Sequence, residues 1–156
     1  MRINTKITRT LAPAAIAGAI AIGGAATATG APAIAQFGAA QSLNAGPMVT
    51  EYTVGDLRPS DDVVNFPVAG RLWEATTTVD AVQGTVTPTI PFFNARADNG
   101  QNYQALYQAY APEGVNALPL PQGAESTGKI YFDVTGAQPT SVVYNDAVVD
   151  RLIWGS

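Results

Sequence analysis

The clearest pattern in the chain is an alternation of apolar and polar residues at positions 129–134, which read KIYFDV. A period of two residues is typical of a β-strand with one face in a core and the other in water. A glycine bounds this segment on each side, at positions 128 and 136. We therefore expect a strand that contributes three side chains to the core: Ile130, Phe132 and Val134.

Several other segments show the same alternation. Residues 48–54 (MVTEYTV) and 72–81 (LWEATTTVDA) predict strands, and Trp73 is the largest side chain on the apolar face of the second. Residues 141–144 and 148–154 predict a final pair of strands around Asn145 and Asp146. Residues 85–89 are β-branched but contain a proline, which favours an edge or a bend.

The strongest hairpin signal lies between residues 92 and 108. Asn99-Gly100 tolerates the positive φ that both central residues of a type I′ turn require. A two-residue turn there pairs Arg96 with Tyr103 and Phe93 with Leu106. That register puts Phe93 and Leu106 on one face, and it puts Arg96 and Tyr103 on the other.

No segment after residue 36 shows a sustained period of 3.6 residues, whereas about seven short strands are separated by Gly, Pro and Asn. This pattern predicts an all-β domain over residues 47–156. We expect an immunoglobulin-like antiparallel β-sandwich of two sheets. The Cys-Trp-Cys signature of antibody domains is missing, so the pattern alone leaves a small barrel as an alternative.

The N-terminus has the composition of a cleaved secretory signal peptide. Three basic residues precede an uncharged run rich in Ala, Gly and Ile. Small residues at 33 and 35 predict cleavage after Ala35, and Ala26-Thr27-Ala28 offers a second signature. A retained membrane anchor is the alternative, although glycines and a proline interrupt the run. We expect residues 36–46 to be a mobile arm or the first extended edge of the domain.

Composition then narrows the chemistry. The chain has 156 residues and contains neither cysteine nor histidine, which excludes disulfides, thiolate nucleophiles, imidazole ligands and a Ser-His-Asp triad. Removal of the leader takes three of the eight basic residues and leaves five against twelve acidic residues, a net charge of −7. Such an acidic chain disfavours nucleic acid and anionic membranes as partners.

Each candidate catalytic or metal site has a simpler explanation. Ser126 lies in an imitation of the nucleophile elbow, but no histidine base exists and a strand follows. Carboxylates at positions 61, 62, 74 and 133 suit glycoside hydrolysis, yet solvated acidic residues are the commoner case. Residues 98–102 resemble part of a calcium loop without its later glutamate, and residues 61–62 and 145–146 are weaker candidates. We therefore assign no catalytic, cofactor or metal residue.

Aromatic residues supply the only candidate interaction surface. Aromatic side chains with few charges nearby suit contact with a protein or a glycan, whereas the alternative is cross-strand packing within the sheet. The four residues concerned are Phe92, Tyr103, Tyr107 and Tyr110.

Four stretches also resemble a known family. They are residues 70–76 (GRLWEAT), 93–96 (FNAR), 121–136 (PQGAESTGKIYFDVTG) and 152–154 (LIW). These stretches are similar to the secreted immunogenic antigens of mycobacteria named MPT or MPB sixty-three. The resemblance implies a small exported protein with an immunoglobulin-like β-sandwich, no enzyme activity and no settled biochemical role. It brings no catalytic residue with it.

Together these observations predict a secreted, extracellular, non-enzymatic protein that binds a host or cell-envelope protein or glycan and needs no cofactor. A carboxylate-dependent envelope hydrolase is the alternative, and a structural protein of the cell surface is a third reading. The sequence leaves the oligomeric state open.

Overall fold

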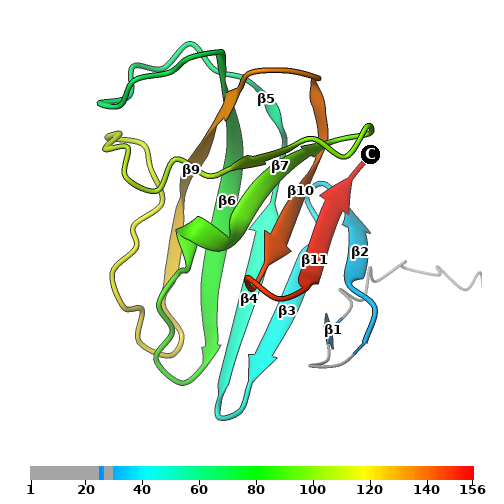
Figure 1. The fold of residues 1–156 in the computed structure, drawn as a ribbon. Coiled ribbons are helices and arrows are strands. Elements are labelled where there is room, and N and C mark those ends of the chain that lie inside the picture. Colours follow the sequence, from blue (N-terminus) through cyan, green and yellow to red (C-terminus); the bar gives the residue numbers. More distant parts are fainter. Residues whose placement is uncertain (1–24, 27–29) are drawn as a thin grey trace, which may run out of the picture.

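Two β-sheets face each other across a shared core (Figure 1). The computed structural model describes residues 25–26 and 30–156. In that part of the chain the first sheet contains six strands. They are β1 (Ala25–Ala26), β3 (Ala40–Ala45), β4 (Met48–Val54), β5 (Arg58–Pro59), β6 (Arg71–Gln83) and β9 (Glu125–Val134).

The second sheet contains five strands, in the order β2-β11-β10-β7-β8. They are β2 (Ala33–Gln36), β7 (Phe93–Ala97), β8 (Asn102–Gln104), β10 (Pro139–Asn145) and β11 (Asp150–Gly155). One turn of 3₁₀-helix, η1 (Ile90–Phe92), leads into β7. Only the pairs β2–β11 and β1–β3 are parallel among the described strands. The fold is the predicted all-β, immunoglobulin-like sandwich.

Strand β6 is the centre of the first sheet. It pairs with β9 along ten residues on one side and with β4 and the short β5 on the other. No helix among the described residues is long and apolar enough to cross a membrane.

The inner faces of the two sheets form one aromatic-rich core. The predicted core residues Ile130, Phe132 and Val134 are buried, as is Trp73. Phe93 packs edge-on against both Tyr52 and Tyr144, with ring centroids 5.4 and 5.2 Å apart. Edge-to-face contacts of this kind stabilise a core beyond the area that they bury.

The hairpin between β7 and β8 forms, but its predicted register is wrong by one residue. Arg96 pairs with Asn102 and Ala95 with Tyr103. The turn holds three residues, and only Gly100 among them has positive φ, which is the geometry of a type I turn followed by a bulge. A one-residue slip exchanges the two faces of a strand, so Tyr103 lies in the core.

The N-terminal segment belongs to the sandwich instead of forming a mobile arm. Residues 40–45 form β3, which pairs with β4 throughout, and the Gln41 side chain is fully buried beneath it. Its Nε2 donates a hydrogen bond of 3.0 Å to the carbonyl of Ile153. Of the two alternatives for residues 36–46, the extended strand is therefore correct and the mobile arm is wrong. The domain begins before residue 47.

Candidate functional site

A glycine contact places a loop across the outer edge of β9. The Lys129 amide donates to the carbonyl of Glu113 at 2.7 Å, and the Val115 amide donates to the carbonyl of Lys129 at 3.1 Å. A Cβ atom added at Gly128 would lie 2.6 Å from the carbonyl carbon of Gly114, so the crossing needs glycine there. This pairing brings Glu113 next to Lys129.

Lys129 gathers three carboxylates from three different segments. Its Nζ lies 2.7 Å from Asp62, 2.7 Å from Glu113 and 3.3 Å from Glu74. The hydrogen bond to Asp62 is the largest influence that raises the pKa of Lys129, with those to Glu113 and Glu74 adding to it. The ammonium group therefore stays charged over the whole physiological range.

Glu74 is the buried member of this group, with a side chain only 4% exposed. Arg58 donates to its Oε1 from Nε and Nη2 at 3.0 and 2.9 Å, and the Ser60 hydroxyl donates to its Oε2 at 2.5 Å. Strand β5 positions these donors, because Arg58 pairs directly with Glu74 on β6. A buried carboxylate requires such partners.

We call these five residues the Lys129 cluster: Arg58, Asp62, Glu74, Glu113 and Lys129. Three carboxylates face two cations, so the cluster carries one excess negative charge. The three acids and their partners come from β5, β6, β9 and two loops, and Lys129 is 67 positions from Asp62 in the sequence. The cluster ties the loops to the first sheet.

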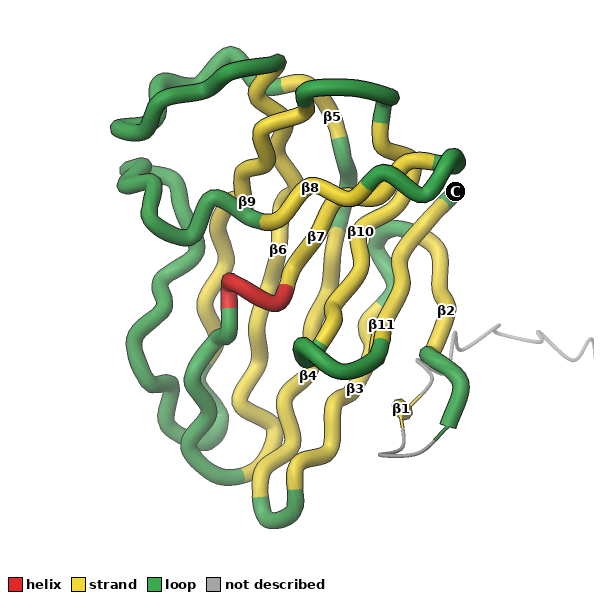
Figure 2. Tube along the Cα trace, in the orientation of Figure 1, coloured by secondary structure: helices red, strands yellow, loops and turns green. Residues whose placement is uncertain are grey.

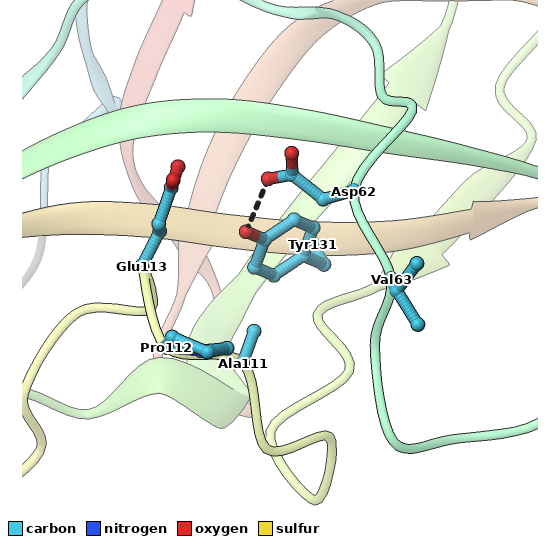
Figure 3. A pocket seen from close by; sticks show the side chains of 6 residues that line it. All are labelled: Asp62, Val63, Ala111, Pro112, Glu113 and Tyr131. Carbon is cyan, nitrogen blue, oxygen red and sulfur yellow. Dashed lines mark hydrogen bonds between the residues drawn. The ribbon is translucent and has the colours of Figure 1, made fainter.

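A cavity of about 200 Å³ opens beside the cluster. Figure 3 shows Glu113 to one side of the Tyr131 ring and Val63 to the other, with the Tyr131 hydroxyl bonded to Asp62 at 2.7 Å. The hydrogen bonds from Lys129 and then Tyr131 hold the pKa of Asp62 below its usual range. We call this cavity the acidic notch.

Two loops that lie side by side form its walls (Figure 2). These paired loops span residues 60–70 and 105–118, and the Asn65 amide joins them by donating to the carbonyl of Tyr110 at 3.1 Å. A second cavity of about 230 Å³ is lined by six residues, which are Phe66, Gln104, Ala105, Leu106, Tyr107 and Gln108. We call this second cavity the apolar notch.

The four aromatic residues proposed from sequence do not form one surface. Tyr103 is buried and donates to the carbonyl of Ala137 at 2.8 Å. Phe92 is half-buried and packs edge-on against Tyr144. Tyr107 and Tyr110 are exposed, and both lie on the paired loops. The candidate surface is wrong for Tyr103 because the predicted hairpin register put this side chain on the face opposite Phe93, whereas it is buried in the core.

The other residues proposed as catalytic from the sequence make structural hydrogen bonds. Ser126 lies within β9 and its Oγ accepts from the Asn116 amide at 3.2 Å. Asp133 accepts from the amides of Ala69 and Gly70, both at 2.8 Å, so it anchors the first of the paired loops. In residues 25–26 and 30–156, no group of three or more acidic side chains is placed to hold a metal ion.

Sequence reasoning missed the two residues at the centre of the site. The alternation put Lys129 and Tyr131 on a solvent-facing side, whereas Tyr131 is buried and Lys129 has a side chain only 18% exposed. The loop that crosses β9 covers them both. The sequence does show that Lys129 and Tyr131 share one face of a strand. It does not show which carboxylates contact them, because those residues are distant in the chain.

The fold and this site define a small immunoglobulin-like β-sandwich with paired loops around two notches. The chain belongs to the family described as a domain of unknown function, DUF1942, whose model matches residues 32–154. Two curated relatives are immunogenic protein MPB63 of Mycobacterium bovis and immunogenic protein MPT63 of Mycobacterium tuberculosis. Each is 50% identical over 110 residues, which covers 70% of this chain and 69% of the relative.

A solved structure extends this comparison to the fold. The 1.5 Å crystal structure of MPT63, described as a secreted protein from Mycobacterium tuberculosis, matches with a TM-score of 0.78 and 44% identity. The match covers 81% of this chain and 98% of that one. The relatives are thus immunogenic antigens, and one of them is described as secreted.

Proposed function

We propose that this chain is a secreted antigen without enzyme activity whose paired loops bind a host or cell-envelope protein. The bound segment would place a basic side chain in the acidic notch and an apolar side chain in the apolar notch. The excess negative charge of the Lys129 cluster is the observation that carries this proposal. Export is supported by the leader-like N-terminus and by the description of the MPT63 structure as a secreted protein.

Charge determines which group suits the acidic notch. Asp62 uses Oδ2 for both of its bonds to Lys129 and Tyr131, and Glu113 has a side chain 65% exposed. Lys129 lies 2.7 Å from Glu113 Oε2, so the printed contacts of both acids with Lys129 use one carboxylate oxygen each. A lysine or arginine side chain of a partner would find two carboxylate oxygens there, and an acidic side chain would be repelled.

Apolar contact would supply most of the affinity. Val63, Tyr107 and Tyr110 are 89%, 51% and 74% exposed on the paired loops. Tyrosine is enriched among the residues that dominate binding energy at protein interfaces. Hydrogen bonds from both loops to β9 favour binding further, because loops that are already held in place require less ordering when a partner docks.

The alternative of a carboxylate-dependent hydrolase is less well supported by this site. Glycoside hydrolysis needs one carboxyl group that is protonated near neutral pH to act as the general acid. The carboxylates at the notch surround an ammonium group, and the pKa of Asp62 is lowered instead of raised. The Asp62 carboxylate is therefore ionised at neutral pH and suits a bound cation better than the role of general acid.

Selection from a displayed library of random peptides tests the proposal. We expect the selected peptides to carry Lys or Arg close to an aromatic or aliphatic residue. Replacement Glu113→Gln should weaken their binding several-fold, and Tyr110→Ala should weaken it by about tenfold. Fluorescence anisotropy with a labelled peptide measures both effects, and higher salt should reduce the contribution of Glu113.

Val148→Ala is the matched control, because Val148 is 83% exposed in the turn between β10 and β11, away from the paired loops. It should leave peptide affinity unchanged. Selection of acidic peptides, or equal loss of affinity in the control and loop variants, would contradict the proposal.

A further inference from the structure

The outer face of the β7–β8 hairpin holds a second, chemically different depression. The observed register pairs Asn94 with Gln104 and Arg96 with Asn102, so these four polar side chains share the face opposite the core. They line a cavity of about 320 Å³ together with residues that include Phe92 and Asn145. We call this cavity the amide groove.

Hydrogen bonds hold the amide groups of this groove in fixed orientations. Asn102 Nδ2 donates to Asn94 Oδ1 at 2.8 Å, and Asn94 Nδ2 donates to the carbonyl of Phe92 at 3.1 Å. Gln104 Nε2 donates to the carbonyl of Pro91 at 2.9 Å. A side-chain amide has two donor hydrogens and two acceptor lone pairs, so each one keeps unused capacity of both kinds.

The charges at the groove neutralise each other. Arg96 donates to both oxygens of Asp150, at 2.6 and 3.1 Å, and Asn145 Nδ2 donates to Asp150 Oδ1 at 2.7 Å. The hydrogen bond from Arg96 is the main reason that the pKa of Asp150 is lowered. The groove therefore presents no net charge, in contrast to the acidic notch, and it suits an uncharged ligand.

Phe92 adds an apolar surface beside these amides. Its ring centroid lies 5.7 Å from that of Tyr144 at an interplanar angle of 84°, and this contact orients the ring, which is half-buried. A sugar ring combines hydroxyl groups, which both donate and accept hydrogen bonds, with an apolar face of C–H groups. Fixed amides next to an aromatic ring match that combination.

We propose that the amide groove binds a neutral carbohydrate, independently of the paired loops. Its volume is at the lower end of the range of roughly 300–1,000 Å³ for small-molecule sites, which fits one or two sugar residues. Asn102 and Gln104 would form hydrogen bonds with hydroxyl groups, and Phe92 would contact the apolar face of the sugar.

Two experiments test this proposal. The first measures binding to an array of neutral and anionic glycans. The second titrates the ¹⁵N-labelled protein with the methyl glycosides of neutral hexoses and N-acetylhexosamines. We expect a neutral sugar to shift the amide signals of β7 and β8. Asn102 is exposed and lines the amide groove but not the apolar notch, and Asn102→Ala should weaken binding at least tenfold. The backbone spectrum of this variant outside the hairpin should match the parent spectrum, which shows that the variant folds.

Tyr110→Ala is the control from the paired loops, and it should bind the sugar as the parent does. Loss of sugar binding in this control would overturn the separate location of the site. A preference for anionic glycans, or an absence of binding by every neutral sugar tested, would overturn the proposed ligand class. Neither result would contradict the separate proposal that the paired loops bind a peptide segment.

Discussion

Gly128 on β9 and Gly114 in the crossing loop lie in backbone contact, with no room for a side chain between them. This contact determines how closely the loop approaches the sheet. It therefore determines whether Glu113 reaches Lys129 and whether the acidic notch exists at all. A single pair of glycines thus connects the packing of the sandwich edge to the proposed binding site.

Replacement Gly128→Ala should destabilise the protein by about 1–3 kcal/mol, because the new methyl group meets backbone atoms that cannot rotate away. Urea denaturation followed by tryptophan fluorescence measures this loss. Gly55→Ala is the control, since its Cβ would have no neighbour closer than 3.7 Å and its φ is not positive. Equal stability of the Gly128→Ala variant and the parent would show that the crossing is not required.

Replacement Glu74→Gln should cost about 2 kcal/mol of unfolding free energy, because Arg58 and Ser60 would lose a buried charged acceptor. Glu113→Gln, at an exposed position of the same cluster, should change stability by less than about 0.5 kcal/mol. The comparison separates Glu74, which stabilises the fold, from Glu113, which is proposed to contact a ligand. Chemical denaturation at pH 7 provides both values.

Replacement Asp80→Asn should stabilise the protein at pH 7 by about 0.5 kcal/mol. Asp80 pairs with Glu51 on one neighbouring strand and Glu125 on the other, and like charges placed opposite each other are destabilising. Burial, then Glu125 and Glu51, raise the pKa of Asp80, so folding favours its protonated form.

The pH dependence of this gain follows from the raised pKa. Protonated Asp80 contributes stability that is fully present below its unfolded pKa near 3.8 and is lost as pH rises through the higher folded value. The advantage of the Asp80→Asn variant should therefore disappear as the pH falls toward about 3.8. Denaturation of both proteins between pH 7 and pH 4 measures it, and a constant difference would contradict this explanation.

The proposed export leads us to expect signal-peptide cleavage after Ala28 and not after Ala35. Ala33 and Ala35 pack against the core, and β2 pairs with β11 from Leu152 to Gly155. Cleavage after Ala35 would remove three of the four residues of β2, whereas the earlier signature leaves the strand whole. Thr27 and Ala28 of this second signature lie outside the described residues, whereas the first predicted cleavage point, after Ala35, lies within them.

Intact mass spectrometry of the exported protein tests this processing site directly. In addition, a chain that begins at Gln36 should be about 2 kcal/mol less stable than one that begins at Thr29, because the outer edge of β11 loses its partner strand. A mature protein that begins at Gln36 with undiminished stability would show that β2 is dispensable.

The sequence by itself determined the fold class and most of the strands. The alternation of apolar and polar residues is a local property, because side chains two positions apart always share a face of an extended chain. Strand β4 has the predicted bounds, and the predicted core residues of β9 are buried. The lack of histidine and cysteine limited the possible chemistry without any knowledge of the fold.

Tertiary structure alone decided where the sites lie. The side chains that meet at Lys129 are far apart along the chain, and no local pattern chooses them as partners. The register of the β7–β8 hairpin depends on a three-residue turn. Relative to the predicted register, the shift of one residue places Tyr103 in the core and places the amide side chains together on the outer face. Local periodicity specifies which residues can share a face, whereas long-range pairing specifies which faces meet.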